Sequence, residues 1–258
     1  MGAQCIVALA ELEARIQQEP ENAQLYKAKG LLLAALGYYR EAGECYSKAI
    51  SIDPFNWEYY RHRAHRFVSC GLFADGVADF TIASRLNPKD WNVWYHLGLS
   101  YFLLGMYEKA DEAYLSCEAL NKTADDLVAV TDWHYMTLRR LGRDADAAKL
   151  LEKITPDLPV SDEVSGSYFK RLLLYKGLIE PEKLFENVDS KAGADLPVVT
   201  QGFGLANYYL MLGDTEKYEE LLNRVIETAA NSHWYSAFAC LAAHVDKINN
   251  AKREVLGE

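Results

Sequence analysis

Residues Trp91–Ala124 have the sequence WNVWYHLGLSYFLLGMYEKADEAYLSCEALNKTA, in which two stretches with helical spacing of apolar residues flank Gly105. A glycine just after the last turn of a helix favours the left-handed conformation that ends it. The pattern therefore predicts a helix, a tight turn at Gly105 and a second helix.

The same pattern recurs every 34 residues through the first half of the chain. A fixed period of this length is typical of repeat architectures, in which each repeat is one supersecondary unit. Four sets of positions keep the period: Pro20, Pro54 and Pro88; Gly37, Gly71 and Gly105; Tyr46, Phe80 and Tyr114; and Ala49, Ala83 and Cys117.

The first unit shows what each helix contributes. We expect one helix over 23–37 and a second over Tyr39–Ile52, which ends before Pro54 because proline disfavours helix in the residue before it. Gly30 in the first helix permits a close approach, and Tyr46 in the second fills the space beside it. A single helix pair does not bury enough apolar surface to be stable alone, so stacked pairs share one continuous core.

These residues resemble the tetratricopeptide repeat family over Ala23–Asn56, Trp57–Asp90 and Trp91–Ala124. Lys122 departs from the pattern, since the earlier units have proline there. The resemblance implies an all-α, right-handed α-solenoid of about six helix pairs. In the third unit, the family's Trp, Leu, Gly, Tyr, Ala and Phe are matched by Trp94, Leu97, Gly98, Tyr101, Ala110 and Tyr114.

The second half matches the pattern less regularly, with candidate turn glycines at Gly142, Gly177 and Gly213. We expect three degenerate units, the fifth with a second helix starting at Pro181, and a last helix capped by Ser232 and running to about Lys247. The units are Val128–Val160, Glu163–Asp189 and Val199–Glu227, with loops at Asp157–Ser165 and Asp189–Pro197. The predicted organisation is one domain over 1–258, with an N-terminal helix in 1–22, regular units in 23–124, degenerate units in 125–230 and a capping helix and tail in 231–258.

The composition of the chain argues against several classes of function and location. The net charge of −10 argues against nucleic-acid and membrane partners. No apolar run is long enough for a membrane span, and the first ten residues lack the basic segment of a secretory signal. The number of cysteines, five, is odd and no two of them form a CxxC motif, which fits buried thiols in a reducing compartment. The sequence thus favours a cytoplasmic protein.

The family resemblance also implies a concave groove lined by the first helix of each pair. Among the groove positions, five residues are basic (Lys27, Arg61, Arg139, Arg140, Arg171) and two are acidic (Glu58, Asp132), the reverse of the whole chain. Arginine pairs with carboxylates through two parallel hydrogen bonds, so we predict a partner peptide or protein segment with acidic groups or a C-terminal carboxylate. The residues predicted to bind it are Lys27, Arg61, His62, His65, Tyr95, His96, Trp133, Arg139, Tyr168, Arg171, Phe203 and Asn207. The alternative is that these residues serve packing and salt bridges within the solenoid.

Two more specific kinds of binding site have less support in the sequence. Some members of the family bind carboxylate tails with a clamp of lysines and asparagines. Lys27 matches its first position, but Leu31, His62, Asn92 and His96 do not match the others. His62 and His65 share a helix face, and His96 lies at an equivalent position one unit later, so three imidazoles could bind Zn²⁺, but no fourth ligand is evident.

Motifs of hydrolases, nucleotide-binding loops and metalloproteases are missing from the chain. We therefore expect no enzyme activity, no metal and no cofactor. The function predicted is a protein-interaction scaffold. Two alternatives remain open: a regulatory protein that senses a peptide or ligand, and a self-assembling structural module.

Overall fold

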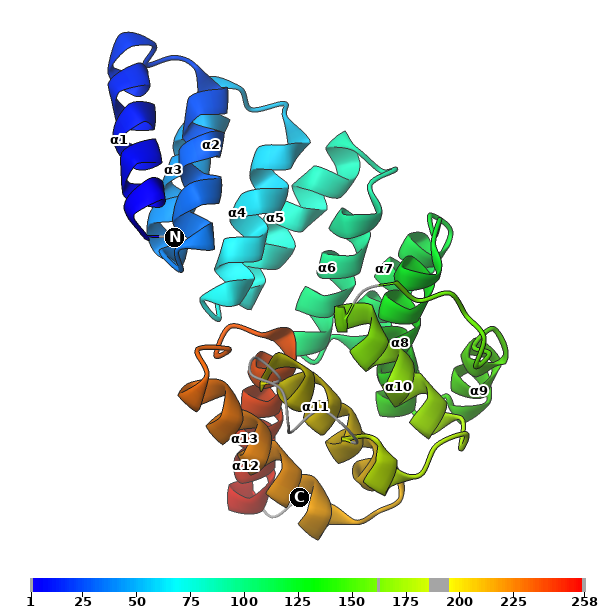
Figure 1. Ribbon diagram of the computed structural model, residues 1–258. Helices are drawn as coiled ribbons and strands as arrows, with labels where there is room; N and C mark the ends of the chain where they lie inside the picture. The colour runs from blue at the N-terminus through cyan, green and yellow to red at the C-terminus, as the bar shows by residue number, and fades with distance from the viewer. Residues whose placement is uncertain (1, 162, 186–194, 257–258) are drawn as a thin grey trace. The chain divides into compact units, whose positions relative to one another are not determined.

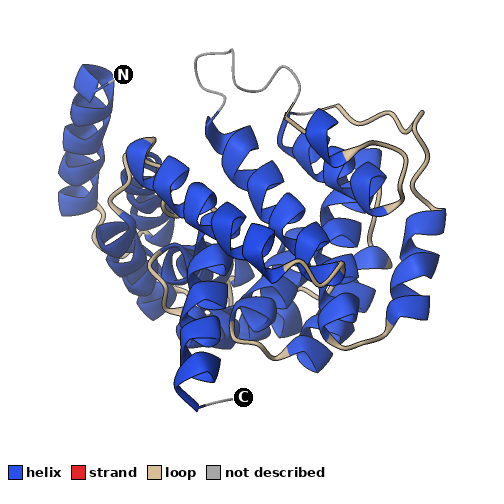
Figure 2. Ribbon diagram, turned by 90° about the horizontal axis from the view of Figure 1, so that it is seen from below, coloured by secondary structure: helices blue, strands red, loops and turns tan. Residues whose placement is uncertain are grey.

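The computed structural model describes residues 2–161, 163–185 and 195–256. Every regular element in these ranges is helical, so the all-α prediction is confirmed for them (Figure 2). Contacts divide the chain into two compact units, unit 1 (Met1–Leu104) and unit 2 (Gly105–Glu258). Among the described helices, none is both long and apolar enough to cross a bilayer.

Unit 1 contains an N-terminal helix followed by regular helices that each pack on the next one in the chain (Figure 1). Their limits agree with the 34-residue period. The helices are α1 (Gly2–Gln18), α2 (Ala23–Ala35), α3 (Tyr39–Ile52), α4 (Trp57–Ser69), α5 (Phe73–Leu86) and α6 (Trp91–Leu103).

The periodic glycines adopt the predicted left-handed conformation. Gly37 and Gly71 have φ angles of 86° and 77°, and Gly142, in the less regular half, has 69°. A residue with a Cβ is strained at such angles, so glycine is the natural choice where one helix must end and the next begin at once.

The prolines also have a recurring role in unit 1. In each 34-residue repeat, the aromatic side chain at the fourth position donates a hydrogen bond to the carbonyl of the proline six residues earlier. These bonds tie the turn to the helix that follows it. They join Tyr26 to Pro20 (3.1 Å), Tyr60 to Pro54 (3.0 Å) and Trp94 to Pro88 (2.9 Å).

The pairing of Gly30 with Tyr46 is confirmed. The Tyr46 ring is fully buried, and a Cβ built on Gly30 would lie 2.6 Å from Tyr46 Cε1. The two helices can therefore approach this closely only because position 30 has no side chain.

Unit 2 contains α7 (Tyr107–Glu118), α8 (Ala124–Arg140), α9 (Asp144–Glu152), α10 (Glu163–Tyr175), the 3₁₀ turn η1 (Pro181–Lys183), α11 (Asp195–Met211), α12 (Thr215–Asn231) and α13 (Phe238–Leu256). Here the contacts are less strictly sequential, because α10 packs on both α8 and α11, and α13 packs on both α11 and α12.

The sequence predicts a second helix in the fifth repeat, but the described residues contain only the 3₁₀ turn that starts at Pro181. This short turn brings Leu184 into a buried cluster with Leu174 and Leu205. The remainder of the expected helix, and most of the loop predicted at Asp189–Pro197, lie outside the described residues. The end of that predicted loop is wrong, because α11 already begins at Asp195. Pro197 lies in its first turn, where proline costs no helical hydrogen bond.

The prediction that Ser232 caps the last helix is wrong. Its hydroxyl donates a hydrogen bond to the carbonyl of Thr228 (2.6 Å), so Ser232 ends α12. His233 follows with a φ of 64°, and α13 begins only at Phe238. The last helix also extends beyond Lys247, to Leu256.

Candidate partner-binding surface

In unit 1 the predicted groove residues lie on α2, α4 and α6. Lys27, Arg61, His62 and His65 are half-buried, whereas Tyr95 and His96 are buried. The surface that a partner could reach is therefore built mainly by α2 and α4.

The three histidines of this surface lie within a set of stacked rings. His62 stacks on Tyr46 with a centroid distance of 5.4 Å, and His96 stacks on Phe80 at 5.7 Å. The ring of His65 lies 4.8 Å from the His96 ring and is tilted by 54° to it. Burial, with smaller contributions from nearby cations, lowers the pKa of His62 to about 4, and burial lowers that of His96 to about 4 as well. Both rings are neutral at pH 7.

Hydrogen bonds occupy one nitrogen on two of these rings. Nδ1 of His96 donates to the backbone carbonyl of Asn92 (2.7 Å), and Nδ1 of His65 accepts a bond from Arg66. No group of three metal-binding side chains is found among the residues that the structure describes.

Four of the five basic groove residues are paired with carboxylates of the chain itself. The pairs are Lys27 with Glu58 (2.7 Å), Arg139 with Asp144 (2.9 Å), Arg140 with Asp246 (2.8 Å) and Arg171 with Asp132 (3.1 Å). The fifth, Arg61, forms no ion pair or hydrogen bond through its side chain with any described residue.

In unit 2 the predicted groove residues are mostly interior. Trp133, Arg171, Phe203 and Asn207 are fully buried, and Tyr168 is nearly so. Only Arg139 of this set is half-buried. As placed in the structure, the buried residues do not present a surface to a partner.

Arg171 is the centre of this interior. Its guanidinium lies 5.5–5.8 Å from the ring centroids of Trp133, Tyr168 and Phe203, within cation–π range. Burial raises the pKa of Asp132, and the charge of Arg171 opposes this. A Cβ on Gly204 would lie 2.5 Å from Arg171 Cγ, so a glycine is needed where α11 passes the arginine.

Arg140 is paired across unit 2. It donates Nη1 to Asp246 Oδ1 (3.2 Å) and Nη2 to Asp246 Oδ2 (2.8 Å), and Nη2 also donates to Asn207 Oδ1 (2.9 Å). Asp246 lies on α13 and is buried. Sequence reasoning placed Arg140 and Asn207 at groove positions but missed Asp246, because no local pattern links residues 106 positions apart.

A second buried network, around His134, was also missed. Its Nδ1 lies within hydrogen-bond distance of Glu118 (2.6 Å) and its Nε2 within hydrogen-bond distance of Asp111 (2.7 Å). Arg143 and Lys153 bind the same two carboxylates from outside. The arrangement joins α7 to α8, and the His134 side chain within it is 2% exposed.

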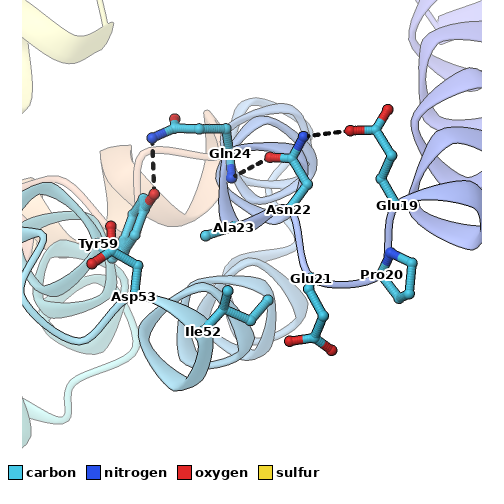
Figure 3. A pocket seen from close by; sticks show the side chains of 9 residues that line it. All are labelled: Glu19, Pro20, Glu21, Asn22, Ala23, Gln24, Ile52, Asp53 and Tyr59. Atoms are coloured by element: carbon cyan, nitrogen blue, oxygen red, sulfur yellow. Dashed lines mark hydrogen bonds between the residues drawn. The ribbon is translucent and has the colours of Figure 1, made fainter.

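An open pocket of about 560 Å³ lies in unit 1 where the turn before α2 meets the end of α3 (Figure 3). Gln24 donates to the hydroxyl of Tyr59 (2.9 Å) on one wall. Three carboxylates, from Glu19, Glu21 and Asp53, line the pocket. Their charge opposes binding of an acidic group in this pocket.

The family model of the tetratricopeptide repeat matches residues 23–56 and 92–123. These two segments of the chain are tetratricopeptide repeats. These two matches correspond to the first and third 34-residue repeats. No curated protein matches the chain.

Solved structures similar to this chain share its fold. A tetratricopeptide repeat protein from Parabacteroides merdae is 17% identical with a TM-score of 0.62, and 93% of each chain is covered. YrrB, described as a repeat protein with an unusual peptide-binding site, is 17% identical with a TM-score of 0.51, over 92% of this chain and 97% of its own. MamA is 19% identical with a TM-score of 0.55, over 59% of this chain and 87% of its own. The fold is thus an α-solenoid of helix pairs.

Proposed function

We propose that this tetratricopeptide repeat protein is an interaction scaffold that binds an acidic segment, or a C-terminal carboxylate, of a partner protein on the face of α2 and α4 around Arg61. The repeat fold itself suggests a scaffold for protein–protein interaction. The choice of Arg61 as the centre of the surface rests on its charge and its surroundings.

The observation that supports this choice is that Arg61 has no ion pair of its own, since Glu58, whose pKa its charge helps to lower, is paired with Lys27. The other four groove cations are neutralised within the chain, while Arg61 has no ion-pair partner among the described residues. Its neighbours His62 and His65 add hydrogen-bonding rings but no negative charge. A half-buried guanidinium in this setting gains most from a carboxylate that arrives from outside, because such a pair is both charge-assisted and bidentate.

The surroundings also favour a segment rather than an isolated anion. Lys27 and Glu58 form a paired rim beside Arg61, and the half-buried His62 ring, which stacks on the buried Tyr46, offers a ring face to the rest of a peptide. YrrB, of similar fold, is described as binding peptide. An extended segment with an acidic residue matches this combination of charge and ring faces.

The test uses fluorescence anisotropy with a set of labelled peptides, in which each acidic peptide is matched by an otherwise identical one with Gln and Asn and an amidated C-terminus. We expect the wild-type chain to bind members of the acidic set more tightly than their neutral matches. Arg61→Glu should weaken this binding at least about tenfold, because it replaces an attractive pair by a repulsive one. The affinity should also fall as salt is raised.

The matched control is Arg85→Glu, the same charge change at an exposed arginine on α5 of the same unit. It should keep the wild-type affinities. The proposal fails if the acidic peptides bind no better than the neutral ones, or if the two reversals have the same effect while both variants keep the helical circular dichroism of the wild type.

A further inference from the structure

A second arginine of α4 also lacks a carboxylate. Arg66 lies in the last turn of the helix, is half-buried and forms no ion pair with any described residue. Arg63, on the same helix, has the usual arrangement, because it donates Nε and Nη2 to the two carboxylate oxygens of Asp79 (2.7 and 2.8 Å). The two arginines therefore differ in what neutralises their charge.

The groups that hold Arg66 in place carry no negative charge. Its guanidinium lies over the Tyr39 ring, 5.0 Å from the ring centroid, and donates a hydrogen bond to Nδ1 of His65. Burial lowers the pKa of Arg66, and no carboxylate is among the groups that oppose this effect. An arginine stays protonated at neutral pH even so, and its charge is therefore uncompensated.

Arg61 and Arg66 act on the same part of α4. His62 and His65 lie between them in the helix. Burial is the largest cause of the lowered pKa of both rings, and the charges of both arginines add to it. Both guanidinium charges thus belong to the face of α2 and α4 where the partner segment is proposed to bind.

The charge on this face exceeds what one carboxylate can compensate. Lys27 and Glu58 neutralise each other, since their side chains form an ion pair (2.7 Å). Arg61 and Arg66 then leave two positive charges that no described carboxylate pairs with. A single acidic side chain neutralises only one of them.

We propose that Arg66 is a second anchor for the partner, and that the bound segment carries two acidic side chains with one residue between them. Arg61 binds one carboxylate and Arg66 binds the other. This inference rests on the proposed binding at Arg61, and it selects an internal acidic segment over a C-terminal carboxylate.

The spacing of the two acids follows from backbone geometry. Arg61 and Arg66 are five positions apart, so their points of attachment are separated by about 7.5 Å along the axis of α4. In an extended segment, alternate side chains point to the same side and lie about 6.7 Å apart, whereas adjacent side chains point to opposite sides. Acids with one residue between them therefore match the two arginines, and adjacent acids do not.

The setting of Arg66 also favours binding of a carboxylate. Its planar guanidinium is already held by the Tyr39 ring and by His65, so little conformational freedom is lost when a partner arrives. Because the group is half-buried, water screens its charge less than that of an exposed arginine.

The experiment measures fluorescence anisotropy of three labelled peptides of equal length with the full-length chain. Each has a blocked N-terminus and an amidated C-terminus in a background of serine and glycine. The first contains one glutamate, the second two adjacent glutamates, and the third two glutamates separated by one serine. We expect the wild type to bind the third at least about tenfold more tightly than the first, and the second much like the first.

The variants separate Arg66 from Arg61. Arg66→Gln should bind all three peptides alike, with the wild-type affinity for the single-glutamate peptide. Arg66→Lys keeps the charge but loses the planar fork, so it should retain about a threefold preference for the spaced peptide. Arg85→Gln, at an exposed arginine of α5, is the matched control and should keep the wild-type preference. If circular dichroism shows that Arg66→Gln does not fold, Arg66→Lys alone decides.

Two outcomes overturn the inference. In one, adjacent and spaced glutamates bind equally well, so net charge governs binding and there is no second anchor. In the other, the folded Arg66 variants keep the full preference of the wild type and only their thermal midpoints change, so Arg66 has a purely structural contact with Tyr39. In both cases, weaker binding of the single-glutamate peptide by Arg61→Glu still supports the proposed function. If none of the acidic peptides binds the wild type, both proposals fail.

Discussion

Acidification should destabilise unit 1 because its stacked histidines resist protonation. Burial lowers the pKa of His62 and of His96 to about 4, against an ordinary value near 6.5. Between these values the unfolded chain takes up protons that the folded unit does not. Unit 1 therefore has its full free energy of unfolding above pH 6.5. This free energy declines as the pH falls from 6.5 to 4, and the histidines change it no further below pH 4.

The size of the effect follows from these pKa values. At pH 5 the linkage relation gives about 2 kcal/mol for a buried imidazole whose pKa falls from 6.5 to 4. His96 is buried, so the full value applies to it. His62 is partly exposed, and solvent screening reduces its share to about 1 kcal/mol. The sum is about 3 kcal/mol, a large part of the roughly 5–15 kcal/mol that stabilises a typical domain. His65 acts in the same direction, since burial lowers its pKa well below the ordinary value.

The assay is hydrogen exchange of the full-length chain at pH 7.5, 6.5, 5.5 and 5.0, corrected for the intrinsic rate and resolved for α4 and α6. The free energy of opening of these helices should fall by about 3 kcal/mol between pH 7.5 and 5. His96→Gln keeps a donor for the Asn92 carbonyl but removes one titrating ring, so the slope should become shallower. His244→Gln, at an exposed histidine of α13, is the matched control. A free energy of opening that stays constant over this pH range would refute the reasoning.

Two further predictions concern the packing of unit 1. Gly30→Ala should destabilise it by about 1–2 kcal/mol, because the new methyl overlaps the Tyr46 ring and overpacking outweighs the gain in helix propensity. Gly43→Ala, where an added Cβ would meet no atom within 4 Å, should instead stabilise by about 0.5–1 kcal/mol, and thermal melts that move both variants in the same direction contradict this. Trp94→Phe removes the hydrogen bond to Pro88 and should cost about 1 kcal/mol in urea unfolding, whereas an unchanged midpoint shows that the bond contributes nothing.

The regular units were predictable because their rules are local. A helix that ends at Gly37 or Gly142 does so for reasons contained in a few neighbouring residues, and the left-handed φ angles confirm this. Ser232 shows the limit of such reasoning. Its hydroxyl can cap the following helix or bond back to the preceding turn, and the sequence does not distinguish these uses. The structure has the second, with Thr228 as acceptor.

The inner surface was harder to predict, because helix register says which residues share a face but not what covers that face. Arg61 and Arg171 hold comparable positions in the sequence pattern. Arg61 is half-buried with no ion-pair partner among the described residues, whereas Arg171 is enclosed by three aromatic rings and Asp132. The surroundings of the two arginines differ because of the tertiary packing in unit 2, where helices distant in sequence meet. The role of Arg61 in binding remains a prediction.

The contact between Arg140 and Asp246 has a consequence for biosynthesis. The helices of unit 1 pack on their sequence neighbours, so each can dock soon after it is made. Arg140 must wait for a residue 106 positions later. At a synthesis rate of about 5–20 residues per second, this delay lasts roughly 5–20 s. Throughout that interval α13 has not yet been made, and the charge of Arg140 lacks the carboxylate that neutralises it in the folded unit. The packing around Arg140 is therefore completed only after the last helix has been synthesised.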